Sequence, residues 1–307
     1  MQVRILRRAL LALPLALSFA VPAVAQVVVK HTKGEVTLAA RPQRVAVFDP
    51  ASLDTLHALG VDAVKGVFNT RMPPGLAKYA GAEYAKVGSL HEPDLEALNK
   101  LKPDLIIVGG RSSAKYDGVK GLAPTIDMTV DNKDFLASSI ANARTLGRIF
   151  GKEAQAEALI GKLNASLAAI RPQAAGAGKA LFVLTSGARM SAYGPGSRFG
   201  ILHDGYGFVP AQPNLKVSSH GQAASFEFIL QANPDWLFVL DRDAAIGRDG
   251  SAARQLLDNA LVKQTSAARK NQVVFVNASN WYLVGSGLGA LQANVDQAAA
   301  ALKGAKP

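Results

Sequence analysis

The chain of 307 residues carries 34 Lys and Arg against 23 Asp and Glu, and its formal net charge is +11. It contains no cysteine, which excludes zinc fingers, iron–sulfur clusters, thiol catalysis and disulfide bonds. The basic residues are scattered and do not alternate with aromatic ones. We therefore expect no nucleic-acid partner and interpret the charge as suited to a small anionic ligand.

The first 25 residues have the pattern of a secretory signal peptide. Three arginines come first, an apolar run from Ala9 to Phe19 follows, and Ala23-Val24-Ala25 is a small-residue cleavage site before Gln26. The apolar run is shorter than the roughly 20 residues of a membrane span, although an uncleaved anchor is the alternative. We expect an exported chain that starts near Gln26 and carries a charge of about +8, because three arginines leave with the leader.

After the leader, short apolar runs alternate with amphipathic segments. A helix is predicted from Ser52, as its N-cap, to Gly60, as its C-terminal stop. Runs of four consecutive apolar residues are typical of strands covered on both faces of a sheet. Such runs are found at 45–48, 105–108, 181–184, 237–240 and 273–276. Their alternation with helices predicts βαβ units and largely parallel sheets.

The middle of the chain lacks strand signals. Residues 135–150 predict one helix, ended by Gly151, and residues 152–170 predict a second, closed by Arg171-Pro172 and followed by a loop over 173–178. The predicted fold class is α/β, with two Rossmann-like lobes, mainly parallel sheets and a ligand cleft between the lobes. We expect an N-terminal lobe over 26–150, a long connecting helix over 151–172 and a C-terminal lobe over 173–307. A single larger sheet with an insertion is the alternative.

The two halves share a repeat. Residues 96–111 and 227–242 both run from Glu through a helix to Pro-Asp, an apolar strand and Arg, with equal spacing. Ligands of open α/β sheets bind beyond the C-terminal ends of the strands, so Arg111 and Arg242 can reach one cleft if the lobes face each other. The alternative is that each arginine pairs with a local carboxylate, such as Asp241 or Asp243 beside Arg242.

Three further residues could contact a ligand. Arg198 lies in a Gly-rich stretch that matches no nucleotide-binding motif. His220 lies in a polar loop and Tyr282 follows the last predicted strand; imidazole and phenolate are both ligands of iron, although simple hydrogen bonding is the alternative. No serine-hydrolase elbow and no His-Glu-x-x-His motif is present, so we do not expect an enzyme.

Five stretches carry a resemblance to a known family. Together they make the mature chain similar, from end to end, to the periplasmic ferric-siderophore-binding proteins of ABC importers. Within that class, whose lobes are joined by one long helix, the chain most resembles the catecholate subgroup, which includes petrobactin-binding proteins. The stretches are Pro-Asp-Leu-Glu-Ala-Leu-x-x-Leu-Lys-Pro-Asp-Leu-Ile-Ile (93–107), Gly-Gly-Arg-Ser-Ser-Ala-Lys-Tyr-Asp (109–117), Gly-Ser-Arg-Phe-Gly-Ile-Leu-His-Asp (196–204), Asn-Pro-Asp-Trp-Leu-Phe-Val-Leu-Asp-Arg (233–242) and Trp-Tyr-Leu (281–283).

The resemblance implies which residues hold the ligand. Arg111, Arg198 and Arg242 match a basic triad that binds the anionic ferric catecholate, and Lys115 and Tyr116 are expected to line the pocket beside Arg111. A cleft that excludes water strengthens such attractions. A haem- or cobalamin-binding protein is the alternative within the same class, and a periplasmic enzyme is the alternative from another class.

The resemblance also implies roles in iron coordination and transport. His220 and Tyr282 match two residues that complete the coordination of Fe(III) when the siderophore is tetradentate. Glu96 and Glu227 match acids on the lobe surfaces that dock onto the permease subunits of the importer. We expect a periplasmic monomer without an intrinsic cofactor, in which Fe(III) is carried by the ligand and the lobes rotate little on binding.

Overall fold

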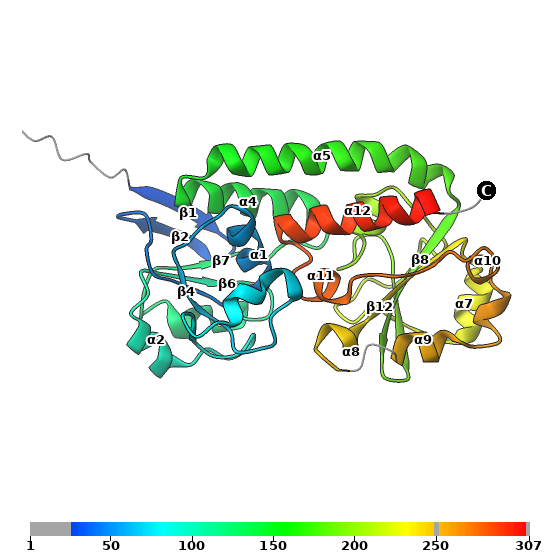
Figure 1. Cartoon of the computed structure of the whole chain (residues 1–307), viewed down its shortest axis with the longest axis horizontal. Helices are drawn as coiled ribbons and strands as arrows, with labels where there is room; N and C mark the ends of the chain where they lie inside the picture. Colours follow the sequence, from blue (N-terminus) through cyan, green and yellow to red (C-terminus); the bar gives the residue numbers. More distant parts are fainter. Residues whose placement is uncertain (1–25, 249–251, 305–307) are drawn as a thin grey trace, which may run out of the picture.

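The computed structural model describes residues 26–248 and 252–304, so the predicted signal peptide lies outside the described residues. Two α/β lobes lie side by side, and the long helix α5 runs along one side of both (Figure 1). Among the described residues, no helix is both long and apolar enough to cross a bilayer.

The N-terminal lobe contains a five-stranded parallel sheet in the order β5-β4-β3-β6-β7. Its strands β3, β6 and β7 are buried along their whole length; β3 and β6 are continuous apolar runs, whereas β7 also contains Thr125 and Asp127. The bounds are β3 Val45–Val47, β4 Val64–Val67, β5 Ala85–Lys86, β6 Leu105–Val108 and β7 Thr125–Asp127. A separate antiparallel hairpin, β1 (Val27–His31) and β2 (Gly34–Leu38), contacts β7.

The C-terminal lobe contains a mixed six-stranded sheet in the order β11-β9-β8-β12-β13, with β10 also paired to β8. Strands β8, β12, β13 and β10 are parallel, whereas β9 and β11 are antiparallel additions at one side. The bounds are β8 Lys179–Ser186, β9 Arg189–Tyr193, β10 Val209–Pro210, β11 Gln222–Ala224, β12 Trp236–Asp241 and β13 Val273–Phe275. The apolar runs locate the parallel strands; β9 and β11 contain polar residues and gave no such signal.

The helices complete both lobes. Their bounds are α1 Pro50–Ala58, α2 Leu95–Leu101, α3 Tyr116–Val119, α4 Phe135–Phe150, α5 Glu153–Gly176, α6 Ile201–Asp204, α7 Phe226–Ala232, α8 Arg242–Ala245, α9 Ala252–Leu257, α10 Ser266–Arg269, α11 Ala278–Tyr282 and α12 Leu288–Gly304. The 3₁₀ helices are η1 Pro74–Ala80, which is kinked at Leu76, η2 Ser113–Lys115 and η3 Val262–Gln264.

Two predicted helix ends are wrong. The N-cap of α1 is Asp49, whose carboxylate accepts a hydrogen bond of 2.9 Å from the Ser52 N–H, because Pro50 favours the first helical position and has no N–H to cap. Helix α5 continues through Pro172 to Gly176 instead of giving way to a loop. Buried Ala174, fully enclosed in the C-terminal core, favours this extra turn.

Helix α5 joins the lobes by packing on both cores. Ala156 belongs to the core of the N-terminal lobe, whereas Ile160, Leu163 and Leu167 belong to the core of the C-terminal lobe. These apolar residues therefore form the buried face of the helix.

The chain crosses between the lobes again after β13. Leu283, Val284 and Ala290 pack in the core of the N-terminal lobe, and Leu291 and Val295 then return to the C-terminal core. Helix α12 lies against both α5 and α1 (Figure 1). The predicted division of the chain into two lobes at residues 150 and 172 stays a prediction. The second crossing places residues 283, 284 and 290, which follow the predicted boundary, in the core of the first lobe.

Candidate functional site

The two copies of the sequence repeat have the same local structure. Helices α2 and α7 are each followed by Pro-Asp, and each aspartate binds the backbone at the start of the neighbouring strand. Asp104 accepts hydrogen bonds of 2.7 and 2.8 Å from the N–H groups of residues 43 and 44, and Asp235 accepts one of 3.0 Å from Lys179 N–H. Strands β6 and β12 are thereby anchored alike, so the arginines that follow them leave corresponding edges of the two sheets.

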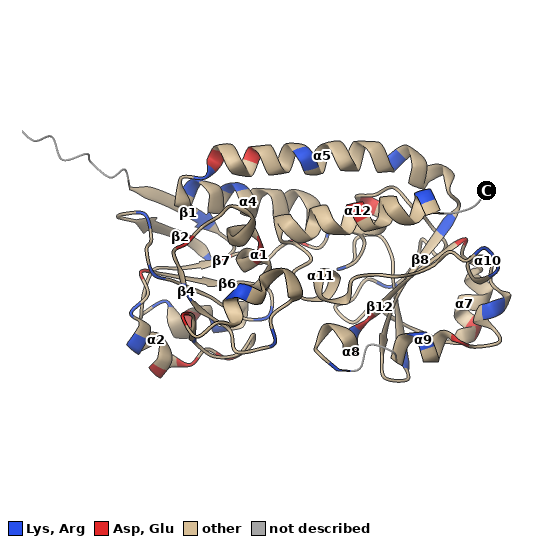
Figure 2. Ribbon diagram, in the orientation of Figure 1, with Lys and Arg blue, Asp and Glu red and all other residues tan. Residues whose placement is uncertain are grey.

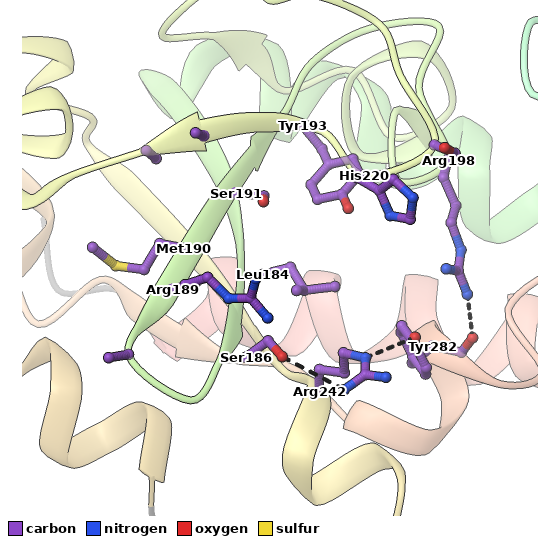
Figure 3. Close-up of a pocket in the computed structure, with 14 residues that line it drawn as sticks. Leu184, Ser186, Arg189, Met190, Ser191, Tyr193, Arg198, His220, Arg242 and Tyr282 are labelled. Atoms are coloured by element: carbon purple, nitrogen blue, oxygen red, sulfur yellow. Dashed lines mark hydrogen bonds between the residues drawn. The ribbon is translucent and has the colours of Figure 1, made fainter.

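Arg111 and Arg198 meet at one backbone oxygen. The Nη2 atoms of Arg111 and Arg198 donate hydrogen bonds of 2.8 and 2.5 Å to the carbonyl oxygen of Tyr282. The Nε atom of Arg242 donates one of 3.0 Å to the phenolic oxygen of the same tyrosine (Figure 3). The structure thus brings the three predicted arginines together around Tyr282, with one from the first lobe and two from the second.

The three guanidinium groups also lie against the tyrosine ring. Their central carbons are 5.1 Å (Arg111), 4.6 Å (Arg198) and 5.7 Å (Arg242) from the ring centroid. The negative π-face of an aromatic ring attracts cations at such distances. Tyr282 therefore holds three like charges close together.

The local carboxylates do not bind Arg242, so that alternative is wrong. Asp241 accepts hydrogen bonds from the N–H groups of Ala244 and Ala253, and thus caps α8. Asp243 accepts one from Gly187 N–H and forms an ion pair with Arg248. Within the described ranges no ion pair engages a triad arginine, which leaves the triad charge available to an anion.

Mutual proximity changes the acidity of these groups. Burial raises the pKa of Tyr282, but the hydrogen bond from Arg242 and the charges of Arg198, Arg242 and Arg111 outweigh it, so the net pKa lies below its usual value. Burial lowers the pKa of Arg198, and the charge of Arg111 lowers it further. The site thus favours negative charge at the phenol and at any ligand beside it.

Arg198 is positioned by the loop between β9 and α6. Gly196 has φ +67°, which suits glycine, and its N–H donates a hydrogen bond of 2.7 Å to the carboxylate of Asp204. The next aromatic, Phe199, is buried and stacks on Phe182. The Gly-rich stretch thus holds Arg198 beside Tyr282.

Three hollows surround Tyr282, and each is bordered by two arginines of the triad. The largest, of about 760 Å³, has Arg198 and Arg242 in its wall; the second, of about 360 Å³, has Arg111 and Arg198; the third, of about 90 Å³, has Arg111 and Arg242. Because Tyr282 lines all three, they form one cleft around it, bordered by residues of both lobes.

His220 and Tyr282 both line the largest hollow (Figure 3). His220 is exposed at the end of a short loop, which is closed by a hydrogen bond of 2.8 Å from Ser218 Oγ to the Gly221 carbonyl. Gly221 has φ +70°, and a Cβ there would lie 2.8 Å from the Ala192 carbonyl, so glycine is needed for the loop to meet β9. Among the described residues, no cluster of three His, Asp or Glu could hold a metal without a ligand's help.

The sequence analysis missed Arg189 and Asp49, which both line the cleft. Arg189, at the start of β9, lines the largest hollow with Arg198 and Arg242 (Figure 3); the strand that carries it gave no signal. Asp49 lines the second hollow, and burial raises its pKa. Its position directly after an apolar run could have suggested it, by the same strand-end rule that identified Arg111.

Lys115 and Tyr116 do not line any of the three hollows, so their expected pocket role is not supported. The turn η2 directs Lys115 to an ion pair of 2.7 Å with Glu92. The ring of Tyr116 lies 5.4 Å from that of His31 in the hairpin β1–β2.

Glu96 and Glu227 occupy equivalent surface positions. Each is exposed in the first turn of a short helix, α2 or α7, whose N-cap is Asp94 or Ser225. The two helices lie towards opposite ends of the molecule (Figure 1). Figure 2 shows that Lys and Arg are scattered over the helices, strands and loops of both lobes.

Residues 45–279 match the family model described as periplasmic binding protein. The chain belongs to this family. Family members bind substrates and are not enzymes. The α/β fold with two lobes and the class of periplasmic binding protein, both expected from the sequence, are confirmed. The chain is 39% identical over 267 residues to the petrobactin-binding protein YclQ of Bacillus subtilis. This alignment covers 86% of this chain and 84% of YclQ.

Other relatives agree with this classification. The chain is 31% identical over 276 residues to the ferric-anguibactin-binding protein FatB of Vibrio anguillarum, covering 88% of this chain and 85% of FatB. The crystal structure of YclQ superimposes with a TM-score of 0.88, at 37% identity, over 91% of this chain and 99% of YclQ. That of the catecholate-siderophore-binding protein VctP of Vibrio cholerae gives 0.84, at 34% identity, over the same shares of both chains.

Proposed function

We propose that this protein binds a ferric catecholate siderophore in the cleft around Tyr282 and delivers it to an ABC importer from the periplasm. The observation that carries the proposal is the convergence of Arg111, Arg198 and Arg242 on one residue between the lobes. Relatives with petrobactin, anguibactin and catecholate siderophores as ligands support it.

The charge of the cleft suits such a ligand. A tris-catecholate complex of Fe(III) carries a charge of about −3, and arginine both pairs with oxyanions and stacks on aromatic rings. Arg189 adds a positive charge to the largest hollow, where none of the lining residues is acidic. In a cleft from which water is displaced, these attractions are stronger than at an open surface.

Tyr282 and His220 would complete the coordination of iron in a tetradentate complex. Both line the largest hollow, where Fe(III) would enter as part of the cargo. The phenol of Tyr282 is surrounded by guanidinium groups that favour its anion, the form that binds Fe(III).

The test of the proposed function is a titration followed by tryptophan fluorescence. The chain has two tryptophans, and Trp281 lines the second hollow, so a ferric complex in the cleft should quench it. We expect quenching by ferric catecholates and not by ferric hydroxamates or haem. Each of Arg111→Gln, Arg198→Gln and Arg242→Gln should weaken binding about ten- to a hundredfold, because a charge-assisted hydrogen bond is lost.

The matched control removes an arginine outside the cleft. Arg269 is exposed on α10, at the far flank of the C-terminal lobe, so Arg269→Gln makes the same charge change without touching Tyr282. Its affinity should stay within about twofold of wild type. Equal affinities in the three triad variants and the control would reject the proposed site.

A further inference from the structure

The smallest of the three hollows has its own arrangement of charges. It lies between Arg111 and Arg242, and a third arginine, Arg71, completes its wall together with His91. None of its lining residues is acidic. Three guanidinium groups around about 90 Å³ form a compact positive end of the cleft, next to the space of about 760 Å³ that could hold a catecholate complex.

Arg71 reaches this hollow from the opposite lobe to Arg242. It lies on the loop between β4 and η1 and is exposed, and its Nη1 donates a long hydrogen bond of 3.4 Å to the Gly247 carbonyl after α8. In the part of the chain that the structure describes, no carboxylate lies within ion-pair distance of Arg71. Its guanidinium group is therefore held weakly and could exchange this carbonyl for an anion at little cost.

Gly247 allows Arg71 to cross between the lobes. Its φ is +84°, and a Cβ at this position would lie 2.9 Å from Cδ of Arg71. The absence of a side chain thus leaves room for the aliphatic part of Arg71 beside the C-terminal lobe, with its charge directed at the cleft.

We propose that this hollow binds a carboxylate group carried by the siderophore, with Arg71 as its specific partner. Its volume admits a group of carboxylate size, and the planar fork of arginine matches the two carboxylate oxygens. Arg242 and Tyr282 line both this hollow and the largest one, so a ligand with its iron in the large space reaches the small one past Arg242. The inference rests on the proposed function and narrows the ligand class to catecholates that bear a carboxylate.

A pair of probes tests the carboxylate directly. Lysine and lysinamide, each acylated with a catechol acid on both nitrogens, give ferric complexes that differ only in a carboxylate and its neutral amide. Fluorescence titrations of both complexes should show that wild type prefers the carboxylate probe by about tenfold, the worth of one partly exposed charge-assisted hydrogen bond. Arg71→Gln should abolish this preference and leave affinity for the amide probe within about twofold.

Two further variants separate local from general effects. Arg71→Lys retains the charge without the fork and should keep only part of the preference. Arg269→Gln lowers the net charge by the same amount as Arg71→Gln and should keep the whole preference for the carboxylate probe.

The outcomes distinguish the inference from the proposed function. If wild type binds both probes equally, or if Arg71→Gln weakens both by the same factor, the carboxylate subsite is wrong while the binding of ferric catecholates stands. If wild type binds neither probe, the proposed function and the subsite both fail.

Discussion

Tyr282 acts through two different chemical groups. Its backbone carbonyl accepts hydrogen bonds from Arg111 and Arg198, and its phenol accepts one from Arg242. The carbonyl keeps an arginine of each lobe in place whatever side chain stands at this position. Preorganised charges bind an anion more tightly, because little conformational freedom is lost when it arrives.

The phenol of Tyr282 gives a prediction at the residue scale. With a tetradentate ferric catecholate, wild type should show a phenolate-to-iron absorption band, because the surrounding arginines lower the pKa of this tyrosine. Tyr282→Phe should remove the band and weaken binding. Visible absorption spectra of the complexes measure both effects.

Tyr193 provides the matched control. It lines the same hollow, but burial raises its pKa, so it is a poor source of phenolate. Tyr193→Phe should therefore keep the absorption band. A band that survives Tyr282→Phe, or disappears in Tyr193→Phe, would contradict the assignment of Tyr282.

The sequence located side chains of the site better than it located backbone groups. Arg111 and Arg242 follow apolar strands, and the rule that ligands bind beyond strand ends identified both. The Tyr282 carbonyl could not be predicted, because every residue has a carbonyl and only folding decides where it points. Arg71 could not be predicted either, because its contact with Gly247 joins residues that are distant in the sequence.

At the scale of the elements, Asp54 links α1 to the start of α12. Its carboxylate accepts a hydrogen bond of 3.0 Å from Ala290 N–H, and Thr55 Oγ1 accepts one of 3.1 Å from Leu288 N–H. A Cβ on Gly287 would lie 2.5 Å from the Asp54 carboxylate, so the approach requires glycine. Thus a side chain of the first lobe caps the helix that ends the chain.

Asp54 predicts a pH dependence of stability. Burial raises its pKa from 3.8 to about 6, although the hydrogen bonds from the N–H groups of Ala290 and Gly289 oppose this. The folded chain therefore binds this proton more tightly than the unfolded chain. Protonation of Asp54 therefore contributes about 3 kcal/mol to the free energy of unfolding. This contribution is complete below about pH 4 and is lost as the pH rises through about 6.

Asp54→Asn isolates this effect, because asparagine can still accept a hydrogen bond but does not titrate. Urea unfolding of both proteins between about pH 4 and about pH 7 should show wild type losing about 3 kcal/mol relative to the variant as the pH rises. A constant difference between the two proteins would show that Asp54 titrates alike in the folded and unfolded chains.

Elements with uniform patterns were predicted well, and those with mixed patterns were not. The five apolar runs became β3, β6, β8, β12 and β13. The runs in the first four strands are buried, as strands covered on both faces require, whereas β13 is half-buried at the edge of its sheet. The extension of α5 beyond Pro172 was missed. Proline usually ends or kinks a helix, but here the packing of Ala174 in the core keeps the last turn helical.

At the scale of the whole molecule, two helices resist relative movement of the lobes. Helix α5 and helix α12 each contribute residues to both cores, so bending at the cleft would disturb packed side chains on each side. We expect small-angle scattering to give nearly the same radius of gyration with and without a ferric catecholate. A large compaction on binding would contradict this, since it would require α5 to bend.

The surface acids give a second prediction at this scale. Glu96→Lys and Glu227→Lys should abolish siderophore-dependent iron uptake by cells without changing ligand affinity, since both residues are exposed and lie outside the described hollows. Glu35→Lys, at an exposed position of strand β2, is the control and should leave uptake intact. Normal uptake in both lobe variants would exclude these acids as docking residues.

The return of the chain to the first lobe has a consequence for dissecting the molecule. A fragment that stops near residue 172 lacks Leu283, Val284 and Ala290, which fill part of its own interior. It would present that unfilled apolar surface to solvent and aggregate unless the complementary fragment were supplied. The halves are therefore not interchangeable modules, and the lobes could not be recombined with those of a relative unless the segment from residue 283 onward were exchanged along with the first lobe.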